Sequence, residues 1–394
     1  MKIAGIVCEY NPFHAGHARH IEETRRALPP DAGVVCVMSG SFTQRGSPAV
    51  FRKHVRAKAA VLGGADLVLE LPLPWALSSA ERFAFGGVSL LDKLGVCTHL
   101  SFGSECGDLE ALNKAAAAAS SEEGKKRTLE NLGRGVSYAA ARAEAMKALG
   151  ADGSVFSEPN DTLAVEYLRA LHAVGSPMAP LAVRRAGDRH DAPDGLSGRA
   201  LRERLCAGED ISPFVPPEAM RLYAGELDAG RAPVVPEAME AAVLARLRSM
   251  TDEEFAALPD ATEGLDRRFM RAARTEPDIL SFLAAVKTKR YALSRLRRML
   301  CCAYLGVRAG DADGTPPYAR VLAANGKGTE ILAEAARRGK LPVLTKPAEV
   351  RSMDARAQRI FGLEAHATDL FSLAFPNVSE RRGGQEWRLS PIIL

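Results

Sequence analysis

The stretch that decides the fold is an apolar run, Ile3 to Val7, followed closely by Glu9-Tyr10-Asn11-Pro12-Phe13-His14-Ala15-Gly16-His17. The apolar run predicts a first strand, and the later residues predict a helix over 16–28. We expect Asn11 to cap that helix and Pro12 to occupy its first turn. A strand, a turn and a helix in this order indicate the start of an α/β domain.

Two histidines and a glycine lie at the start of the predicted helix. His14 and His17 are three residues apart, so they share one face at the positive end of the helix. A polyphosphate placed there would meet free backbone N–H groups and two imidazoles. Gly16 has no side chain, which lets a flat base or ribose approach the backbone. A stray histidine is usually structural, but this position between strand and helix favours a nucleotide site.

The composition describes a soluble globular protein of two or three domains. The chain has 394 residues, of which 47% are hydrophobic and 25% charged, so a large core is affordable. No run approaches roughly eighteen uncharged apolar residues, and the predicted first strand begins at residue 2, so we expect neither a membrane span nor a targeting peptide. The seven cysteines include no Cys-x-x-Cys pair. We therefore expect a cytoplasmic location and no metal site made by protein side chains.

Strands and helices alternate through the first half of the chain. Near-continuous apolar strands separated by helices predict a doubly wound, Rossmann-like parallel sheet. In such sheets the ligand lies beyond the carboxyl ends of the strands. We expect the turns after the first, fourth and fifth strands to converge on one crevice. The expected strands cover 2–8, 33–38, 66–71, 99–102 and 179–184, and the expected helices cover 16–28, 48–62, 78–94, 109–120 and 160–174.

The second half has a different character and predicts a mainly helical C-terminal region. Three prolines, at 213, 216 and 217, mark the break, and a Gly/Asp-rich stretch over 306–317 predicts a loop. We divide the chain into an ATP-binding, nucleotidyltransferase-like catalytic domain over 1–210, a helical basic region over 211–308 and a small mixed region over 309–394. The best strand of the last region covers 341–344.

Further turns carry polar residues suited to a phosphate-bearing substrate. The loop over 38–49 is rich in glycine and hydroxyl residues and holds one guanidinium, Arg45, so we favour a substrate-covering role over a plain connection. Asn160 opens a predicted helix, where a capping role is the simplest interpretation. Arg185 follows the fifth strand and is a candidate phosphate partner. Ser197 caps another predicted helix, and Arg202 lies within its first turns, where a cation opposes the helix dipole unless an anion joins it.

Positive charge is concentrated in one stretch, over 265–308. It holds eleven Lys or Arg and only three acids, a local excess of +8 in a chain whose net charge is +4. Lys287, Tyr291, Ser294 and Arg298 would share one helical face. An amphipathic helix with a solvated basic face is the alternative, but the excess and the tyrosine favour RNA contact. The residues we expect to bind RNA are Lys287, Lys289, Arg290, Arg295 and Arg298.

Together these motifs resemble one family. They are Glu9–His17, Met38-Ser39-Gly40 with Gln44-Arg45-Gly46-x-Pro48-Ala49, Phe102-Gly103-Ser104-Glu105, Pro159-Asn160, Lys287 to Tyr291, and Tyr318-Ala319-Arg320-Val321-Leu322. In this order they resemble the bacterial tRNA(Met) cytidine acetate ligases, which belong to the His-x-Gly-His nucleotidyltransferase superfamily. The resemblance spans nearly the whole chain. It implies that ATP and acetate form acetyl-adenylate, and that the acetyl group moves to the wobble cytidine of elongator tRNA(Met) to give N4-acetylcytidine.

The resemblance also implies roles for individual residues. The second superfamily signature appears here as Leu196-Ser197-Gly198-Arg199-Ala200-Leu201-Arg202. His14, His17 and Arg202 would be catalytic, because they can stabilise charge that grows on the phosphate oxygens, with Mg²⁺ accompanying the nucleotide. The implied ATP-binding residues are Val7, Glu9, Asn11, Pro12, Phe13, His14, Gly16, His17, His20, Gly103, Asn160, Arg185 and Ser197.

Two other functions fit parts of the sequence. An adenylyltransferase acting on a small phosphate ester or mononucleotide could use the same N-terminal site without RNA. An enzyme of that class has no RNA partner, so this function would not explain the basic stretch over 265–308. An RNA-binding protein with a degenerate nucleotide site is a second alternative, and the intact His14, Gly16 and His17 argue against it.

Overall fold

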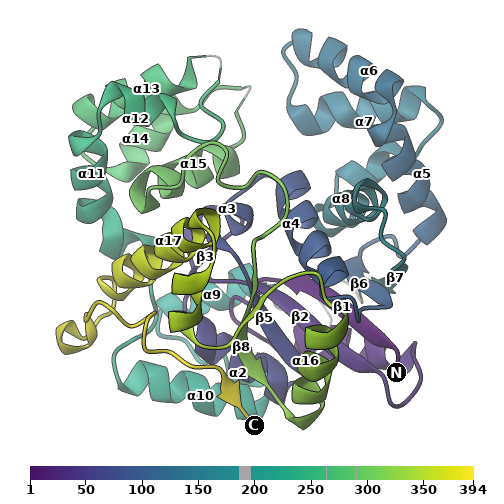
Figure 1. Cartoon of the computed structure of the whole chain (residues 1–394). Coiled ribbons are helices and arrows are strands. Elements are labelled where there is room, and N and C mark those ends of the chain that lie inside the picture. The colour runs from purple at the N-terminus through teal and green to yellow at the C-terminus, as the bar shows by residue number, and fades with distance from the viewer. Residues whose placement is uncertain (186–196, 263, 290) are drawn as a thin grey trace.

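The first strand lies inside one large sheet, with a neighbour on each side (Figure 1). This computed structural model describes residues 1–185, 197–262, 264–289 and 291–394. β1 (Ile3–Cys8) pairs in parallel with β2 (Gly33–Ser39) on one side and with β6 (His99–Ser104) on the other. The strand order is β10-β8-β5-β2-β1-β6-β7, so the connections diverge between β1 and β6. Such a switch point leaves a crevice beyond the carboxyl ends of the strands.

The doubly wound parallel sheet expected from the sequence is confirmed. All five strands predicted in the first half are present, each within two residues of its expected ends. Pairing is parallel throughout the eight-stranded sheet except between β5 and β8, which are antiparallel. The remaining strands of this sheet are β5 (Leu67–Leu71), β7 (Ala179–Arg184), β8 (Ala319–Ala324), β9 (Val343–Leu344) and β10 (Ile392–Ile393).

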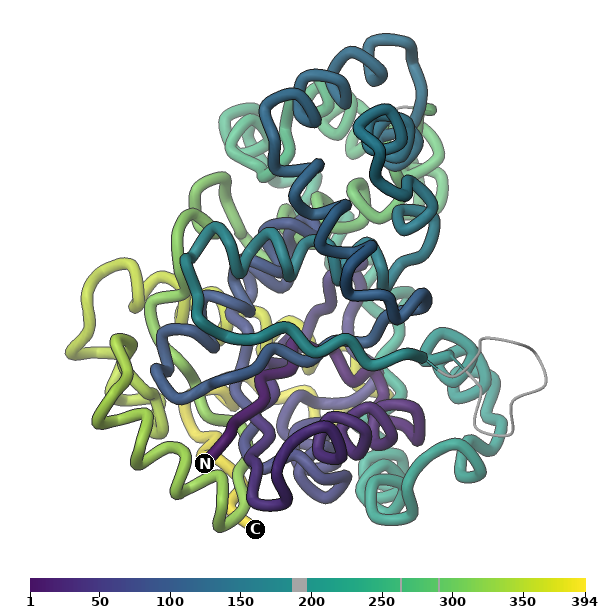
Figure 2. Tube along the Cα trace, turned by 90° about the vertical axis from the view of Figure 1, so that its right-hand side faces the viewer, coloured from purple at the N-terminus to yellow at the C-terminus, as the bar shows by residue number. Residues whose placement is uncertain are grey.

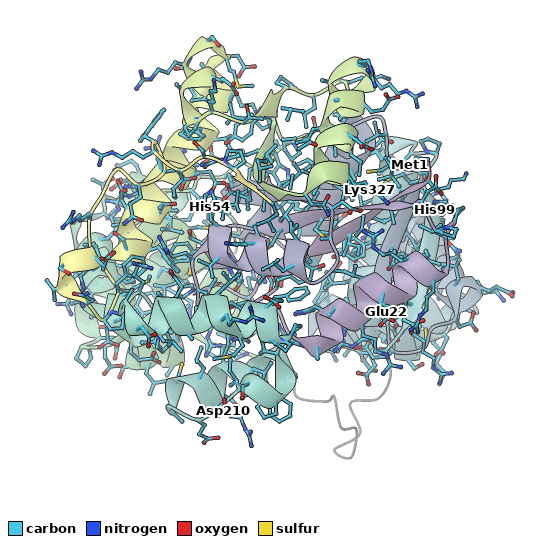
Figure 3. The ribbon with its side chains drawn as sticks, turned by 90° about the horizontal axis from the view of Figure 1, so that it is seen from below. Met1, Glu22, His54, His99, Asp210 and Lys327 are labelled. Atoms are coloured by element: carbon cyan, nitrogen blue, oxygen red, sulfur yellow. The ribbon has the colours of Figure 1, made fainter. Side chains whose placement is uncertain are left out.

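The strands are apolar along most of their length, and successive side chains point to opposite faces of the sheet, so a core forms on each face. On one face Val35 and Leu69 join Leu91 of α4 (Ala80–Lys93) and Ile331 of α16 (Gly326–Arg338). The opposite core holds Val34 and Val68 with residues of four helices: α1 (Ala15–Arg26), α2 (Lys53–Leu62), α9 (Gly198–Cys206) and α10 (Pro217–Asp228). Figure 3 looks onto this second face, where α1 carries Glu22 and α2 carries His54.

Two groups of helices extend from the α/β core on opposite sides of the molecule (Figures 1 and 2). The first follows β6 and comprises α5 (Leu109–Ser120), α6 (Glu122–Gly133) and α7 (Tyr138–Ala148); the chain returns through α8 (Pro159–Val174). The second comprises α11 (Glu240–Ser249), α12 (Asp252–Ala256), α13 (Leu265–Thr275), α14 (Ile279–Val286) and α15 (Leu293–Leu305). Short helices complete the structure: α3 (Leu73–Ala76) and the 3₁₀ turns Gly153–Phe156, Ser212–Phe214, Pro236–Met239, Pro347–Ser352 and Val378–Glu380.

The last part of the chain returns to the sheet. No helix or strand interrupts the expected loop between α15 and β8, a stretch that the structure describes throughout. Beyond it, β8 pairs with β5, with β9 and with β10. The helix α17 (Ala355–Ser372) contacts α15 and α3. The boundaries proposed at 210 and 308 stay predictions, but the 309–394 region shares a sheet with the N-terminal domain.

One helix begins later than the sequence indicates. We expected a helix over 48–62, yet α2 begins at Lys53, and the preceding residues form a hairpin. Its strands are β3 (Phe42–Thr43) and β4 (Ser47–Pro48), and Gly46 closes the turn with φ of +72°. Edge strands tolerate proline, which explains why Pro48 pairs here instead of opening the helix. No helix in the described part of the chain is both long and apolar enough to cross a membrane.

Candidate active site

The first helix is capped by a histidine rather than by the asparagine we expected. His14 has extended backbone angles, φ −141° and ψ 175°, and its Nδ1 accepts a hydrogen bond from Gly16 N at 3.1 Å. Asn11 cannot cap because its Oδ1 accepts from Val50 N at 2.9 Å, which ties the turn to the loop before α2. Pro12 follows a cis peptide bond and lies outside the helix. The prediction for Asn11 and Pro12 is therefore wrong, although the helix starts where expected.

The two histidines lie side by side, as their spacing predicts. The ring centroids of His14 and His17 are 3.9 Å apart. Tyr10 packs against His17 at 4.8 Å, and Phe13, which is fully buried, lies 5.9 Å from the same ring. Nδ1 of His17 is buried and has no hydrogen-bond partner among the residues that the structure describes. A β-carbon on Gly16 would lie 2.9 Å from Cε1 of His14, so only glycine lets the His14 ring fold back over the helix start.

A second helix N-terminus meets the first at His14. Ser197 caps α9, as expected, by accepting a hydrogen bond from Ala200 N at 3.3 Å. A β-carbon on Gly198 would lie 3.8 Å from Nε2 of His14. Nη1 of Arg202 donates to the Asn11 carbonyl at 2.6 Å and so joins the two helix starts. Two positive helix ends and a guanidinium at one point form an anion-binding arrangement.

The carboxyl ends of β6 and β7 complete the crevice. Arg185 N donates to the Ser104 carbonyl at 2.9 Å, which extends the pairing of the two strands by one residue. The side chain of Arg185 runs beside Gly103, where an added β-carbon would lie 3.5 Å from its Cγ. The three turns predicted to converge do so, since β1, β6 and β7 are adjacent in the sheet.

The electrostatics favour an incoming anion. Burial, together with the positive charges of Arg185 and Arg202, lowers the pKa of His14 to about 4. Burial and Arg185 lower the pKa of His20 to about 4, and burial with neighbouring His14 and Arg185 lowers the pKa of His17 well below its usual range. At neutral pH the site thus presents three uncharged imidazoles beside two guanidiniums.

Three further predicted residues line the end of β1 and the body of α1. Glu9 Oε1 accepts a hydrogen bond from Gln44 N at 2.6 Å, and burial raises the pKa of Glu9 despite the nearby charge of Arg202. Nε2 of His20 lies 3.1 Å from the Ser101 hydroxyl of β6. Val7 points its side chain into the core, and only its backbone is placed near the strand end.

Asn160 joins the end of β6 through Glu105, a residue that the sequence offered only as part of a family motif and not as a site residue. The capping role expected for Asn160 is wrong, because α8 begins at Pro159 with Glu158 in the cap position. Asn160 Nδ2 instead donates to Glu105 Oε1. Asp161 N donates to Glu105 Oε2 at 2.9 Å, and Glu105 N donates to Asp161 Oδ1 at 2.9 Å. The reciprocal hydrogen bonds of Glu105 and Asp161 join the end of β6 to the start of α8. In the sequence, the only indication of this contact is that one acid follows a predicted strand and the other lies at a predicted helix start.

Known proteins share both this sequence and this fold. A family model described as HIGH Nucleotidyl Transferase matches residues 1–386. A tRNA(Met) cytidine acetate ligase of Acetivibrio thermocellus is 35% identical, with 100% of each chain covered. One of Caldanaerobacter subterraneus subsp. tengcongensis is 36% identical, with 96% of each covered. The chain belongs to the tRNA(Met) cytidine acetate ligase family of HIGH nucleotidyl transferases.

Solved structures of this family agree with the fold over the full length. The crystal structure of Thermotoga maritima TmcAL bound with alpha-thio ATP is 33% identical, covers 100% of both chains and has a TM-score of 0.92. The apo form I of the same Thermotoga maritima protein is 32% identical, with a TM-score of 0.93 and the same coverage. The α/β sheet with its helical extension is therefore the architecture of the family.

The basic region of this family member is less uniform than its sequence suggests. The helical face expected to carry Lys287, Tyr291, Ser294 and Arg298 does not exist, because α14 ends at Val286 and α15 begins only at Leu293. Tyr291 is 5% exposed, with the Arg295 guanidinium 5.0 Å from its ring centroid, so it is not free to stack on a base. Lys287 and Ala292 both have extended backbone angles, so the chain leaves the helical path between α14 and α15 and the helical period breaks.

The five residues expected to bind RNA have different surroundings. Lys289 is exposed, whereas Lys287 Nζ donates to the carbonyls of Thr288 and Tyr291. Arg295 Nη2 donates to the Asp260 carbonyl at 3.0 Å. Arg298 is only 9% exposed, and burial lowers its pKa. Arg290 lies outside the described residues.

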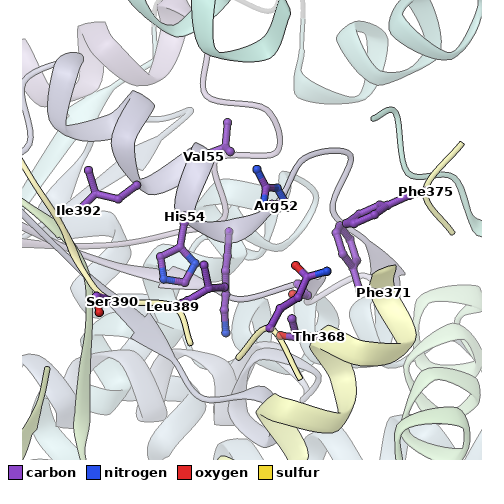
Figure 4. Close-up of a pocket in the computed structure, with 12 residues that line it drawn as sticks. Arg52, His54, Val55, Thr368, Phe371, Phe375, Leu389, Ser390 and Ile392 are labelled. Carbon is purple, nitrogen blue, oxygen red and sulfur yellow. The ribbon is translucent and has the colours of Figure 1, made fainter. Parts of the chain in front are cut away.

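A separate cavity lies beside α2 (Figure 4). Its volume is about 170 Å³, and its lining includes His54, Thr368 and Phe371 but none of the predicted site residues. Lys53 also lines the cavity, and its Nζ donates to Glu70 at 2.6 Å and to Glu386 at 2.5 Å. Burial raises the pKa of Glu70, but Lys53 and Arg320 outweigh it and hold that pKa at about 2. These buried ion pairs fasten the C-terminal region to the sheet.

Proposed function

We propose that this protein is an ATP-dependent ligase that activates acetate as acetyl-adenylate and transfers the acetyl group to the wobble cytidine of elongator tRNA(Met). The observation that carries this proposal is the meeting of two helix N-termini at His14, with Arg185 and Arg202 beside them. Family membership over the full length supports the same activity. The product on the RNA is N4-acetylcytidine.

The first step places ATP along Val7 to His20, with its phosphates over the starts of α1 and α9. An acetate oxygen attacks the α-phosphorus, a new P–O bond forms, and pyrophosphate leaves with the electron pair of the broken bond. Negative charge then grows on the phosphate oxygens. Backbone N–H groups, Arg202, His14 and His17 would stabilise that charge, and the meeting of the two helix starts supports this role.

Magnesium would accompany the nucleotide rather than occupy a protein-made site. Among the residues that the structure describes, no group of three His, Cys, Asp or Glu side chains could hold a metal ion. When bound to the triphosphate, Mg²⁺ would neutralise part of the phosphate charge. Its ligands would be phosphate oxygens and water.

In the second step the exocyclic amine of the cytidine attacks the acetyl carbonyl carbon. A C–N bond forms, the bond to the AMP phosphate oxygen breaks, and the amine loses one proton. No covalent enzyme intermediate is needed. The hairpin of β3 and β4, which touches Glu9 through Gln44, would exclude water from the acetyl-adenylate. This chemistry implies acetate, ATP and elongator tRNA(Met) as substrates and a cytoplasmic location.

The direct test is incorporation of labelled acetate into purified elongator tRNA(Met) in the presence of ATP. We expect label at the wobble cytidine and none when ATP is omitted. A tRNA(Met) with uridine at that position serves as the matched control, because uridine lacks the reacting amine. Label in a small-molecule product alone would instead identify a small-substrate adenylyltransferase. Binding of tRNA without any labelled product would identify an RNA-binding protein.

A further inference from the structure

The hairpin of β3 and β4 connects the nucleotide crevice with the basic helical region. At one end Gln44 N donates to Glu9 Oε1 at 2.6 Å, and Gln44 Nε2 donates to the Ser78 carbonyl at 3.1 Å. At the other end the turn rests on the backbone of α15. A β-carbon on Gly46 would lie 2.4 Å from both the Arg297 carbonyl carbon and Arg298 N. Gly46 also has φ of +72°, so the turn fits this contact only with glycine.

Arg45 lies at the tip of this hairpin, between Gln44 and Gly46. Its side chain is exposed and makes no hydrogen bond or ion pair with the residues that the structure describes. Its positive charge nevertheless affects the pKa values of two residues of the crevice, Glu9 and Arg202. Burial raises the pKa of Glu9, and the charges of Arg202 and Arg45 are among those that oppose the rise. Burial lowers the pKa of Arg202, and the like charge of Arg45 adds to that effect.

Arg56, on α2 beyond the hairpin, is an arginine with a structural role and serves for comparison. Arg56 is fully buried and donates to the carbonyls of Glu9, Ser39 and Gly40. Its donors are thus used by the turns around the site. Arg45 has the same donor groups, but none of them donates to the residues that the structure describes, although its charge lies near that of Arg202. An exposed guanidinium in that position suits a phosphate, which it can bind with two parallel hydrogen bonds.

We propose that Arg45 binds a backbone phosphate of the tRNA beside the reacting cytidine. This inference rests on the proposed function. Such contacts fix the register of a nucleic acid without reading its bases. The phosphate would be held one residue from Gln44, which touches the nucleotide site, and one residue from Gly46, which touches α15. Arg45 thereby positions the cytidine amine over the acetyl-adenylate and takes no part in forming that intermediate.

The test compares the two half-reactions in the full-length Arg45→Ala variant. Acetate-dependent exchange of pyrophosphate into ATP, and the affinity for ATP measured by calorimetry, should stay within about twofold of the wild type. The KM for tRNA in acetyl transfer should rise by about tenfold. The slope of log kcat/KM against log salt should fall by about one, the change expected for one lost phosphate contact. Arg45→Lys should restore part of the tRNA affinity. Arg221→Ala on α10, also an exposed arginine, is the matched control.

Two results would overturn the proposal. An Arg45→Ala variant that transfers acetyl to tRNA with wild-type KM and salt dependence would show that Arg45 does not touch the RNA. Equal losses in pyrophosphate exchange and in transfer would assign Arg45 to the nucleotide. Failure of the proposed function is distinguishable from both, because the wild-type protein itself would then neither exchange pyrophosphate with acetate nor label tRNA.

Discussion

The histidine turn at residues 8–17 and the basic region at 265–308 differ in how well the local sequence predicts which groups are available to a ligand. In the turn, backbone N–H groups and side chains from adjacent residues converge, because a strand and a helix fix their directions over a few residues. In the basic region the positive charges come from α13, from α15 and from the segments that adjoin them, because α14 holds no Lys or Arg, and tertiary packing decides which charges remain available. Local geometry therefore preserves chemistry that a mere concentration of charge does not.

The largest effect should come from the histidine turn itself. His17→Ala removes an imidazole that packs against His14 at the helix start. We expect acetate-dependent pyrophosphate exchange to fall by about 100- to 1,000-fold, the usual loss for one donor to a transition-state oxyanion. His366→Ala changes an exposed histidine on α17 and should leave the rate unchanged. A His17→Ala variant that exchanges pyrophosphate at the wild-type rate would remove the histidines from the mechanism.

Acetyl transfer should be nearly as sensitive to a change at Gly46, where the hairpin of β3 and β4 contacts α15 of the basic region. Gly46→Ala places a β-carbon 2.4 Å from the α15 backbone at a positive φ. We expect the free energy of unfolding to fall by about 1–3 kcal/mol and acetyl transfer to fall with it, as measured by urea titration and tRNA labelling. Gly362→Ala lies inside α17 with no atom near its added β-carbon and should be neutral or slightly stabilising. Equal effects of the two variants would contradict a specific contact at Gly46.

Within the basic region, substitution of an exposed cation should affect tRNA binding, whereas substitution of a buried one should affect stability. Lys289→Ala removes an exposed charge, so we expect the Kd for tRNA to rise roughly three- to tenfold with a smaller salt slope and no change in stability. Arg298→Ala removes a side chain that is 9% exposed. It should lower the free energy of unfolding by about 1 kcal/mol through lost packing, with little direct effect on RNA affinity. Filter binding and urea titration distinguish the two, and the reverse pattern would undo the assignment.

The smallest effect should be a pH dependence of the histidine turn. The pKa of His14 and of His20 is about 4 in the free protein, below the usual 6.5. Because the unfolded chain binds these protons more readily, the stability contributed by the neutral rings is complete above about pH 6.5 and is lost as pH falls toward 4. A bound triphosphate would raise both pKa values, so ATP binding near pH 6 should take up protons. Calorimetry in buffers of different ionisation enthalpy measures this uptake; release of protons would contradict the assignment.

Much of the first half follows from sequence because each element is specified locally. Apolar runs bounded by turns predicted five strands, and the order of strand, turn and helix predicted the crevice at their ends. The capping of α1 did not follow, because Asn11 is a better cap than His14 by propensity and only the distant Val50 N diverts it. The pairing of Asn160 with Glu105 likewise joins residues 55 positions apart. Contacts of this kind are set by packing and leave no local signal.

The antiparallel pairing of β8 with β5 has a consequence for how the helical region behaves during folding and catalysis. Since β7 lies at one edge of the sheet and β8 on the other side of β5, the helices α11 to α15 form a long excursion between two strands of the same sheet. Both ends of that excursion are anchored, so it cannot swing like an appended domain on a single hinge. Ribosomal synthesis must also pass residue 324 before β5 gains this neighbour. Until then, the nascent enzyme carries an open sheet edge.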